Sequence, residues 1–185
     1  MYKFIETGKR HSRMVDMVFG AIYCEGEAAT AHGYYTGVPK ELRGDQIPLV
    51  LMLLRWDGFV GFPGGKVDEG EDLITALRRE LREEINFNVD PKKANLLCSL
   101  ATQNDDRHIH CYEYNVGKSW FRHAITQAAQ AEHFLSETQG CFGVQVAHFE
   151  GGGGIYDFLK NNFKATAKME LECLIRTKKW VPLGV

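Results

Sequence analysis

The chain has 185 residues, of which 44% are hydrophobic and 25% charged, a composition ordinary for a globular protein and unlike a disordered or fibrous one. This length can support one substantial core, and we expect a single domain over residues 1–185. The formal net charge of −2 gives no overall cationic signal for nucleic acid, so any RNA contact would need a local basic patch.

The five cysteines are an odd number, are widely spaced and include no Cys-x-x-Cys pair. Their spacing favours neither a disulfide framework nor a zinc site, and we expect the reduced thiols of an intracellular protein. No apolar run reaches the roughly 18 residues of a membrane span, and no secretory leader is evident. We therefore expect a cytoplasmic or nuclear protein that makes no membrane contact.

The first third of the chain is predicted to form strands and turns. Apolar residues favour a buried strand over residues 13–24, and the glycine-rich residues 25–45 are interpreted as loop with at most a short edge strand. Residues 47–56 form the most hydrophobic run and predict a central strand. The Asp-Gly pair that follows predicts a tight hairpin turn into residues 59–62.

The later part of the chain alternates between strands and helices. Two strands are predicted over residues 94–102 and 108–116, and a helix rich in alanine and glutamine over residues 119–137. A further strand over residues 143–149 and, after four glycines, a last helix over about residues 155–176 complete the chain. This order predicts a mixed α/β fold with helices packed on a sheet.

One helix in the middle of the chain has the strongest signal. Leu73, Leu77, Leu81 and Ile85 recur at every fourth residue, which indicates an amphipathic helix with a buried stripe. Asp72 precedes the stripe and is a predicted N-cap, because its side-chain oxygen can accept from the first free backbone N–H groups.

Three carboxylates, Glu80, Glu83 and Glu84, fall along one edge of that buried face when residues are placed at about 100° intervals. Neighbouring like charges repel, and the repulsion grows when they are half buried. A hard divalent cation would offset it, since Mg²⁺ and Mn²⁺ prefer oxygen ligands. The alternative is a surface helix whose glutamates are neutralised by arginines. The arginines, which the same wheel places on the solvent side, are Arg78, Arg79 and Arg82.

The spacing of these residues resembles a known signature. Gly65, then Glu71 six positions on, then the run RELREEINF over residues 79–87 resemble the Nudix box. One departure is Asn86, where the box has glycine; asparagine also tolerates the left-handed conformation that ends a helix. The resemblance implies a Nudix-type α/β/α sandwich with a mixed sheet, and a hydrolase that cleaves pyrophosphate bonds.

The parts of the box suggest how a cation would be held. Glu80 and Glu84 lie one helical turn apart, Glu83 can reach the same ion or a second one, and a glycine turn allows a backbone carbonyl to approach closely. In Nudix hydrolases, the residues matching these glutamates bind Mg²⁺ or Mn²⁺ together with a carbonyl of the glycine turn, which we assign to Gly64.

The resemblance also implies an orienting residue and a general base. Arg79 would orient the box by pairing with Glu71 across the loop. The base varies between family members, and a carboxylate that is not fully engaged as a ligand can take the proton. We assign the base to Glu84, with Glu83 as the second choice and Glu170, outside the box, as the third.

Residues 48–87 and 151–174 are similar to the snoRNA-decapping Nudix enzymes, which are also inosine and deoxyinosine diphosphatases. This similarity implies hydrolysis of purine nucleoside diphosphates such as (deoxy)inosine diphosphate, of capped RNA, or of both. One alternative is a pyrophosphatase for ADP-ribose or dinucleoside polyphosphates. Another is a catalytically silent RNA-binding protein on the same fold, although such proteins typically lose box glutamates and this chain keeps all of them.

The substrate residues of that subgroup transfer only in part. Arg55 and Phe62 match nucleotide-contacting positions, whereas the family's N-terminal histidine falls on Phe19 and a C-terminal glutamine falls on Glu170. A histidine near the metal falls near Ala101. Without the resemblance, the two phenylalanines would be interpreted as core residues, Arg55 as a surface residue and Glu170 as a solvated one.

Lysines at positions 160, 164 and 168 recur along the predicted last helix and could follow an RNA backbone, although such a row is more often only solvated. A homodimer is permitted by apolar strands but not required. Four histidines show no ligand spacing and are interpreted as structural. They are His108, His110, His133 and His148.

Overall fold

The computed structural model describes residues 2–5, 15–28, 46–102, 107–148 and 153–183. The described strands are β1 (Tyr2–Ile5), β2 (Val15–Ala28), β3 (Gln46–Arg55), β4 (Val60–Gly61), β5 (Gly64–Lys66), β6 (Asn95–Thr102), β7 (Arg107–Asn115) and β8 (Thr138–Gln145). The described helices are α1 (Leu73–Ile85), α2 (Lys118–Gln127), α3 (Gly154–Phe158) and α4 (Ala167–Lys178), with short 3-10 turns at Pro91–Lys93 and Ala128–Gln130.

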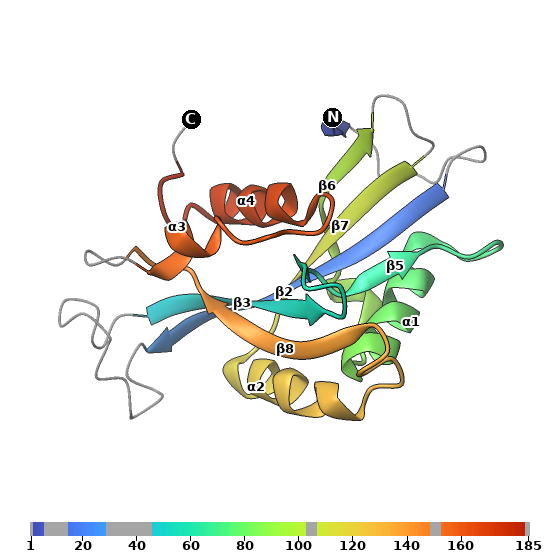
Figure 1. The fold of residues 1–185 in the computed structure, drawn as a ribbon, viewed down its shortest axis with the longest axis horizontal. Coiled ribbons are helices and arrows are strands. Elements are labelled where there is room, and N and C mark those ends of the chain that lie inside the picture. Colours follow the sequence, from blue (N-terminus) through green and yellow to red (C-terminus); the bar gives the residue numbers. More distant parts are fainter. Residues whose placement is uncertain (1, 6–14, 29–45, 103–106, 149–152, 184–185) are drawn as a thin grey trace.

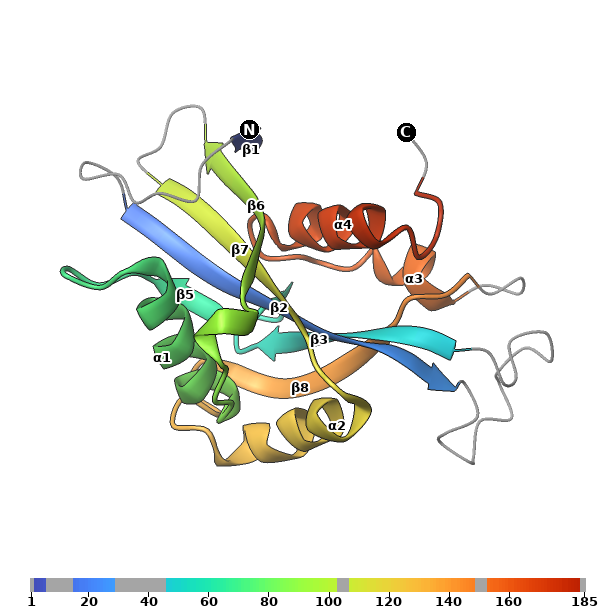
Figure 2. The ribbon, with the colours of Figure 1, turned by 180° about the vertical axis from the view of Figure 1, so that it is seen from behind.

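The strands form one mixed sheet between two helical layers, with α1 and α2 on one face and α3 and α4 on the other (Figure 1). The sheet order is β1-β6-β7-β2-β3-β4, while β5 pairs with β2 and β8 pairs with β3. β2 and β7 run parallel, and the other paired strands are antiparallel. The predicted α/β/α sandwich with a mixed sheet is therefore confirmed, and the view from behind shows the same layers (Figure 2).

β2 lies in the middle of the sheet and is apolar on both faces, as expected for a strand covered by helices on both sides. Val18 and Ile22 pack in the core on the α1 side, whereas Ala21 and Tyr23 pack in the core on the α4 side. The strand begins at Val15 and extends to Ala28, past the predicted end at residue 24. The loop prediction over residues 25–45 is wrong for residues 25–28, which belong to β2, and residues 29–45 lie outside the described residues.

The ends of α1 are as predicted. The Asp72 carboxylate accepts from the backbone N–H groups of Ile74 and Thr75, at 2.9 Å each, which satisfies two of the free donors of the first turn. Asn86 ends the helix with φ 52° and ψ 38°, the left-handed conformation for which asparagine replaces glycine. The departure from the Nudix box at this position therefore preserves the helix end.

The helix predicted over residues 119–137 is too long. α2 ends at Gln127, and the backbone of residues 131–137 forms turns, in which the N–H of His133 donates to the Glu83 carbonyl at 2.8 Å. The strand predicted over residues 143–149 is displaced, because β8 occupies Thr138–Gln145. Gly143 breaks the apolar alternation there, and the absence of its Cβ leaves room for the Phe121 ring.

The predicted last helix over residues 155–176 is two helices. Between α3 and α4 the chain passes beside β4, where the Val60 N–H donates to the Asn162 carbonyl and the Lys164 N–H donates to the Val60 carbonyl. These bonds replace helical ones, and Ala165 takes a positive φ of 46° before α4 begins. No helix in the described part of the chain is long and apolar enough to span a membrane.

Candidate active site

The glycine turn between β4 and α1 lies against the box glutamates without any intervening side chain. Gly64 has φ 141°, and a Cβ there would come within 2.1 Å of the Val18 carbonyl oxygen. A Cβ on Gly65 would come within 2.6 Å of a Glu80 carboxylate oxygen. Gly64 therefore requires glycine, since a larger residue would displace the backbone of β2, whereas a larger residue at Gly65 would displace the Glu80 carboxylate.

Glu84 is the most buried of the box carboxylates, with 1% of its surface exposed. Its Oε2 accepts from the Gly64 N–H at 2.7 Å, whereas its Oε1 has no hydrogen-bond partner among the described residues. Burial raises the pKa of the carboxyl to about 8, against the opposing effect of the Gly64 N–H. A buried carboxylate oxygen of this kind can bind a cation.

Arg79 connects the loop to the box. Its Nε and Nη2 bond the two Glu71 carboxylate oxygens at 3.1 and 2.9 Å, which confirms the predicted pairing. Its Nη1 bonds Glu80 at 2.8 Å and lies 3.3 Å from Glu83 Oε2, while Nη2 donates to the Lys66 carbonyl. The prediction that this arginine lies on the solvent side is wrong, because its long side chain folds back over the carboxylates.

The charges of the cluster do not balance. The Arg79 guanidinium lowers the pKa of Glu71, but burial outweighs the same guanidinium at Glu80, whose pKa is raised. One guanidinium contacts four carboxylates, those of Asp68, Glu71, Glu80 and Glu83, whereas the Glu84 carboxylate bonds Gly64 instead. Arginine neutralisation alone is therefore insufficient, and the all-oxygen donor set fits a hard divalent cation.

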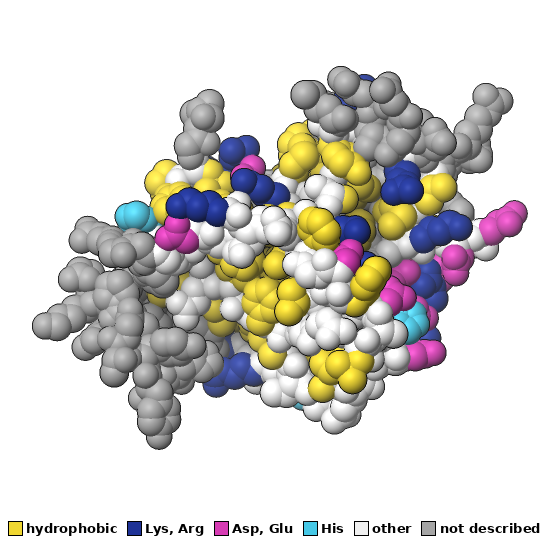
Figure 3. Space-filling view, viewed as in Figure 1, with side chains coloured by type: hydrophobic (Ala, Val, Ile, Leu, Met, Phe, Trp, Pro, Cys, Tyr) yellow, Lys and Arg dark blue, Asp and Glu magenta, His cyan; other side chains and the backbone are white. Residues whose placement is uncertain are grey.

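A cavity of about 400 Å³ opens beside these carboxylates. Charged side chains of both signs gather on this side of the molecule, around α1 and β5 (Figure 3). Acidic groups at one wall and basic groups around it suit a phosphate chain bridged to a cation. The basic residues that line the cavity are Arg55, Lys66, Arg79, Arg107 and Lys164.

The four predicted substrate residues lie around this cavity and its small extension. Phe19 and Arg55 line both, and the buried Arg55 Nε has no hydrogen-bond partner among the described residues. Phe62 is buried and lines only the extension, whose volume is about 30 Å³. Ala101, the position of the family's metal-neighbouring histidine, lines neither cavity.

Glu170 also lines the extension, and the interpretation of this residue as solvated is wrong. It is 1% exposed, and the Thr166 hydroxyl donates to its Oε1 at 2.5 Å. Burial raises the pKa of the carboxyl to about 7, against the opposing hydrogen bonds of the Thr166 hydroxyl and the Cys111 thiol. This buried carboxyl can therefore accept or donate a hydrogen bond at the end of the cavity.

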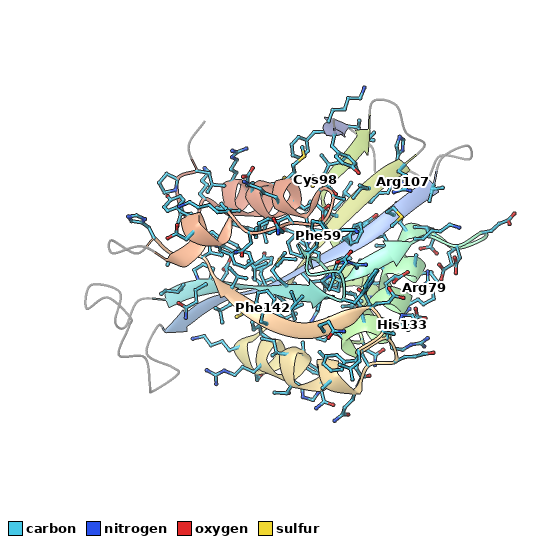
Figure 4. All side chains as sticks on the ribbon, viewed as in Figure 1. Phe59, Arg79, Cys98, Arg107, His133 and Phe142 are labelled. Atoms are coloured by element: carbon cyan, nitrogen blue, oxygen red, sulfur yellow. The ribbon has the colours of Figure 1, made fainter. Side chains whose placement is uncertain are left out.

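The structure adds a carboxylate that the sequence did not indicate. Glu137 lines the cavity from the turn before β8, and its charge contributes to the raised pKa values of Glu80 and Glu84. Its neighbour in space, His133, lies on the same side of the molecule as Arg79 (Figure 4). No local spacing could have shown this, since both residues fell within a predicted helix.

The lysine row does not exist as a helical stripe. Lys160 follows α3 and pairs with Asp157, and Lys164 pairs with Asp57 at 2.8 Å beside the cavity. Of these three lysines, only Lys168 lies on α4. The lysines therefore face different surroundings, and only Lys164 reaches the candidate site.

Comparisons with known proteins agree with this geometry. Residues 34–180 match the family described as Nudt16-like, U8 snoRNA-decapping enzyme-like. The chain is 62% identical to a U8 snoRNA-decapping enzyme of Homalodisca vitripennis over 94 residues, which are 49% of this chain and 50% of that enzyme. It is 30% identical to the mouse U8 snoRNA-decapping enzyme over 161 residues, which are 82% of this chain and 81% of that enzyme.

Solved structures support the fold independently. A MutT/nudix family protein from Enterococcus faecalis superposes with a TM-score of 0.61 at 10% identity, over 93% of this chain and 64% of that one. At this identity the likeness concerns the fold alone.

Proposed function

Because the chain belongs to the U8 snoRNA-decapping enzyme-like (Nudt16-like) family of Nudix hydrolases, we propose that it hydrolyses a pyrophosphate bond of a nucleotide with Mg²⁺ or Mn²⁺. The observation that carries the proposal is the buried Glu84 carboxylate, with one oxygen fixed by Gly64 and the other without a partner among the described residues. A solvated acidic surface would not bury a carboxylate and leave one of its oxygens without a partner.

The cation would be held by Glu80, Glu83, Glu84 and the Gly64 carbonyl, all of which offer oxygen. When bound, a hard divalent ion neutralises phosphate charge and makes water a better nucleophile. Arg79 holds Glu80 and Glu83 in place through its own bonds to Glu71, so their oxygens need no reorganisation when the substrate arrives.

Glu84 is our candidate general base. The Gly64 N–H holds its Oε2, so that Oε1 is left to accept a proton. Its pKa of about 8 describes the site without a cation; nearby positive charge favours the ionised form and lowers that value toward the working range of a base. Glu83 remains the second candidate. Glu170 is less suitable as a base, because it lines the extension of the cavity instead of the wall formed by the box.

For the substrate, we propose a purine nucleoside diphosphate such as (deoxy)inosine diphosphate, or the capped end of an RNA. The basic lining would hold the phosphates, with Arg55 presenting a partly exposed guanidinium to the cavity. Phe19 offers a ring on which a base can stack, and Phe62 closes the extension. Glu170 would contact the base, because its pKa of about 7 allows it to match either a donor or an acceptor on the base edge.

A panel of IDP, dIDP, GDP, ADP-ribose and capped RNA, assayed with Mg²⁺ and with Mn²⁺, tests the proposal. We expect metal-dependent release of a nucleoside monophosphate from IDP or dIDP, or release of the cap from RNA. Faster turnover of ADP-ribose would favour the alternative pyrophosphatase. RNA binding that weakens with salt, without hydrolysis of any of these compounds, would contradict the proposal and indicate the catalytically silent alternative.

A further inference from the structure

A second cluster of metal-ligand residues lies on the opposite side of β2 from Phe19. Asp16 on β2 is opposite His108 on β7 in the parallel pairing, and Val18 is opposite His110. Since side chains alternate along a strand, all three polar side chains lie on one face of the sheet. β2 and β7 run side by side in both views of the fold (Figures 1 and 2).

The donor atoms of this cluster are close enough to share an ion. One atom each from Asp16, His108 and His110 lies within 4.8 Å of the other two. The His110 Nε2 and Asp16 Oδ1 are 3.2 Å apart. Neighbouring ligands of a tetrahedral zinc ion lie roughly 3.3–3.5 Å apart, from bond lengths of about 2.0–2.2 Å. This pair is close to that separation, and His108 would need to move by at most roughly 1.5 Å.

The surroundings of the cluster support metal binding through an independent observation. The other ring nitrogen of His110, Nδ1, lies 3.0 Å from the Ser99 hydroxyl on β6. Histidines that bind metals usually engage their second nitrogen with an oxygen, which sets the tautomer and the orientation of the ring. The Ser99 hydroxyl therefore fixes the ring so that Nε2 of His110 is directed toward Asp16.

Burial and donor type decide which metal would fit. Asp16, His108 and His110 are all at most 6% exposed. Mg²⁺ usually keeps several waters, and a buried site has little room for them, whereas two imidazoles and a carboxylate suit Zn²⁺ and similar transition-metal ions.

We propose that Asp16, His108 and His110 form a second metal site, distinct from the box glutamates, that binds one divalent transition-metal ion of the zinc class. The ion would tie β2 to β7. The Asp16 carbonyl also accepts from the Val67 N–H at 2.9 Å, just after β5, so the site stabilises the sheet beside the glycine turn. The rival interpretation is a hydrogen-bonded chain from Ser99 through His110 to Asp16 with no metal.

The test uses the full chain with Glu80, Glu83 and Glu84 all changed to glutamine, so that zinc cannot bind the box. Zn²⁺ is added, excess is removed by desalting, and the retained metal is measured by elemental analysis. We expect about one zinc per chain, loss of that zinc in His108→Gln, and a tenfold to hundredfold weaker affinity in Ser99→Ala. His123→Gln, which removes an exposed histidine, is the matched control and should retain the metal.

Cobalt provides a second readout, because four-coordinate Co²⁺ absorbs visible light more strongly than octahedral Co²⁺. Retention of zinc by His108→Gln, or a folded parent that retains none, would overturn the proposal.

If His108→Gln does not fold, crystals of the unaltered chain in excess Mg²⁺ can be soaked with Zn²⁺. An anomalous peak between Asp16 and His108 supports the site, and its absence rejects it. Failure here leaves the hydrolase proposal standing, since the box is not involved.

Discussion

The α1 glutamate cluster and the Asp16–His108–His110 cluster differ in donors, burial and support. The first offers only oxygens, opens to a cavity of about 400 Å³ and is held by a guanidinium. The second offers two imidazoles and one carboxylate, is closed to solvent and is held by strand pairing and the Ser99 hydroxyl. Oxygen donors beside an open cavity suit a hard ion that exchanges ligands with a substrate, whereas a sealed mixed set suits an ion that stays.

Burial leaves a polar atom without a partner in the first cluster, but it goes with hydrogen-bonded ring nitrogens in the second. In the first cluster, burial raises the pKa of Glu84 because the carboxylate keeps one oxygen without a partner among the described residues. In the second, the same degree of burial is accompanied by a hydrogen bond to each nitrogen of His110. An unfilled buried acceptor indicates a ligand that is bound during function, whereas hydrogen bonds to both ring nitrogens fix the orientation of an imidazole that can bind a metal.

The largest effect is expected from Glu84→Gln, which removes the proposed base and proposed cation ligand while keeping the shape of the side chain. Turnover should fall by about 10²–10⁴-fold, the range of general-base catalysis. Steady-state hydrolysis of the best substrate of the panel measures it, with circular dichroism to verify the fold. Glu69→Gln, an exposed change of the same kind, should be close to wild type. Unchanged turnover in Glu84→Gln would contradict the assignment of Glu84 as general base.

A smaller effect concerns stability and pH in metal-free buffer. The folded-state pKa of Glu84 is about 8, above its ordinary value of 4.5, so the protonated carboxyl is favoured in the folded state. Its contribution is complete below the ordinary pKa and is lost as the pH rises through about 8. The free energy of unfolding should therefore fall between about pH 5 and pH 9, by on the order of a few kcal/mol.

Urea unfolding in a chelator, compared between wild type and Glu84→Gln, measures this dependence. The variant should lose less stability over the same range, because glutamine does not titrate. Glu170, whose raised pKa acts in the same direction, is present in both proteins and cancels in the difference. Mg²⁺ at the upper end of the range should restore wild-type stability and leave the variant less affected. Parallel curves for the two proteins would contradict the buried, titrating carboxyl.

The smallest effect is expected from His110→Asn in the second cluster. The substitution removes the ring that bonds both Ser99 and Asp16, and it should destabilise the fold by about 1–3 kcal/mol, as for the loss of a buried hydrogen-bond partner. Hydrolysis by the remaining folded protein should be nearly unchanged. Thermal unfolding with His123→Asn as the exposed control gives the comparison. A loss of turnover at full stability would mean that the two clusters are coupled in catalysis.

Much of the α1 glutamate cluster could be predicted, because its features depend on residues that are close together in the sequence. The four-residue repeat of apolar positions, the Asp72 cap, the Asn86 helix end and the adjacency of the box glutamates all follow from helical geometry. The pairing of Arg79 with Glu71 came from the family resemblance and is confirmed. The direction of the Arg79 side chain toward the carboxylates was not predicted. A helical wheel gives the direction of the backbone position, whereas the end of a long side chain can fold back.

The sequence by itself determined the α1 helix, its caps, the three glutamates on one edge and the glycine turn that reaches them. Only the tertiary structure decided that Glu170 is buried, that Glu137 joins the cavity, and that Asp16 meets two histidines from a strand more than ninety residues away. The physical reason is that helix periodicity acts between neighbours in the chain, whereas burial and cross-strand proximity depend on which distant segments the sheet brings together.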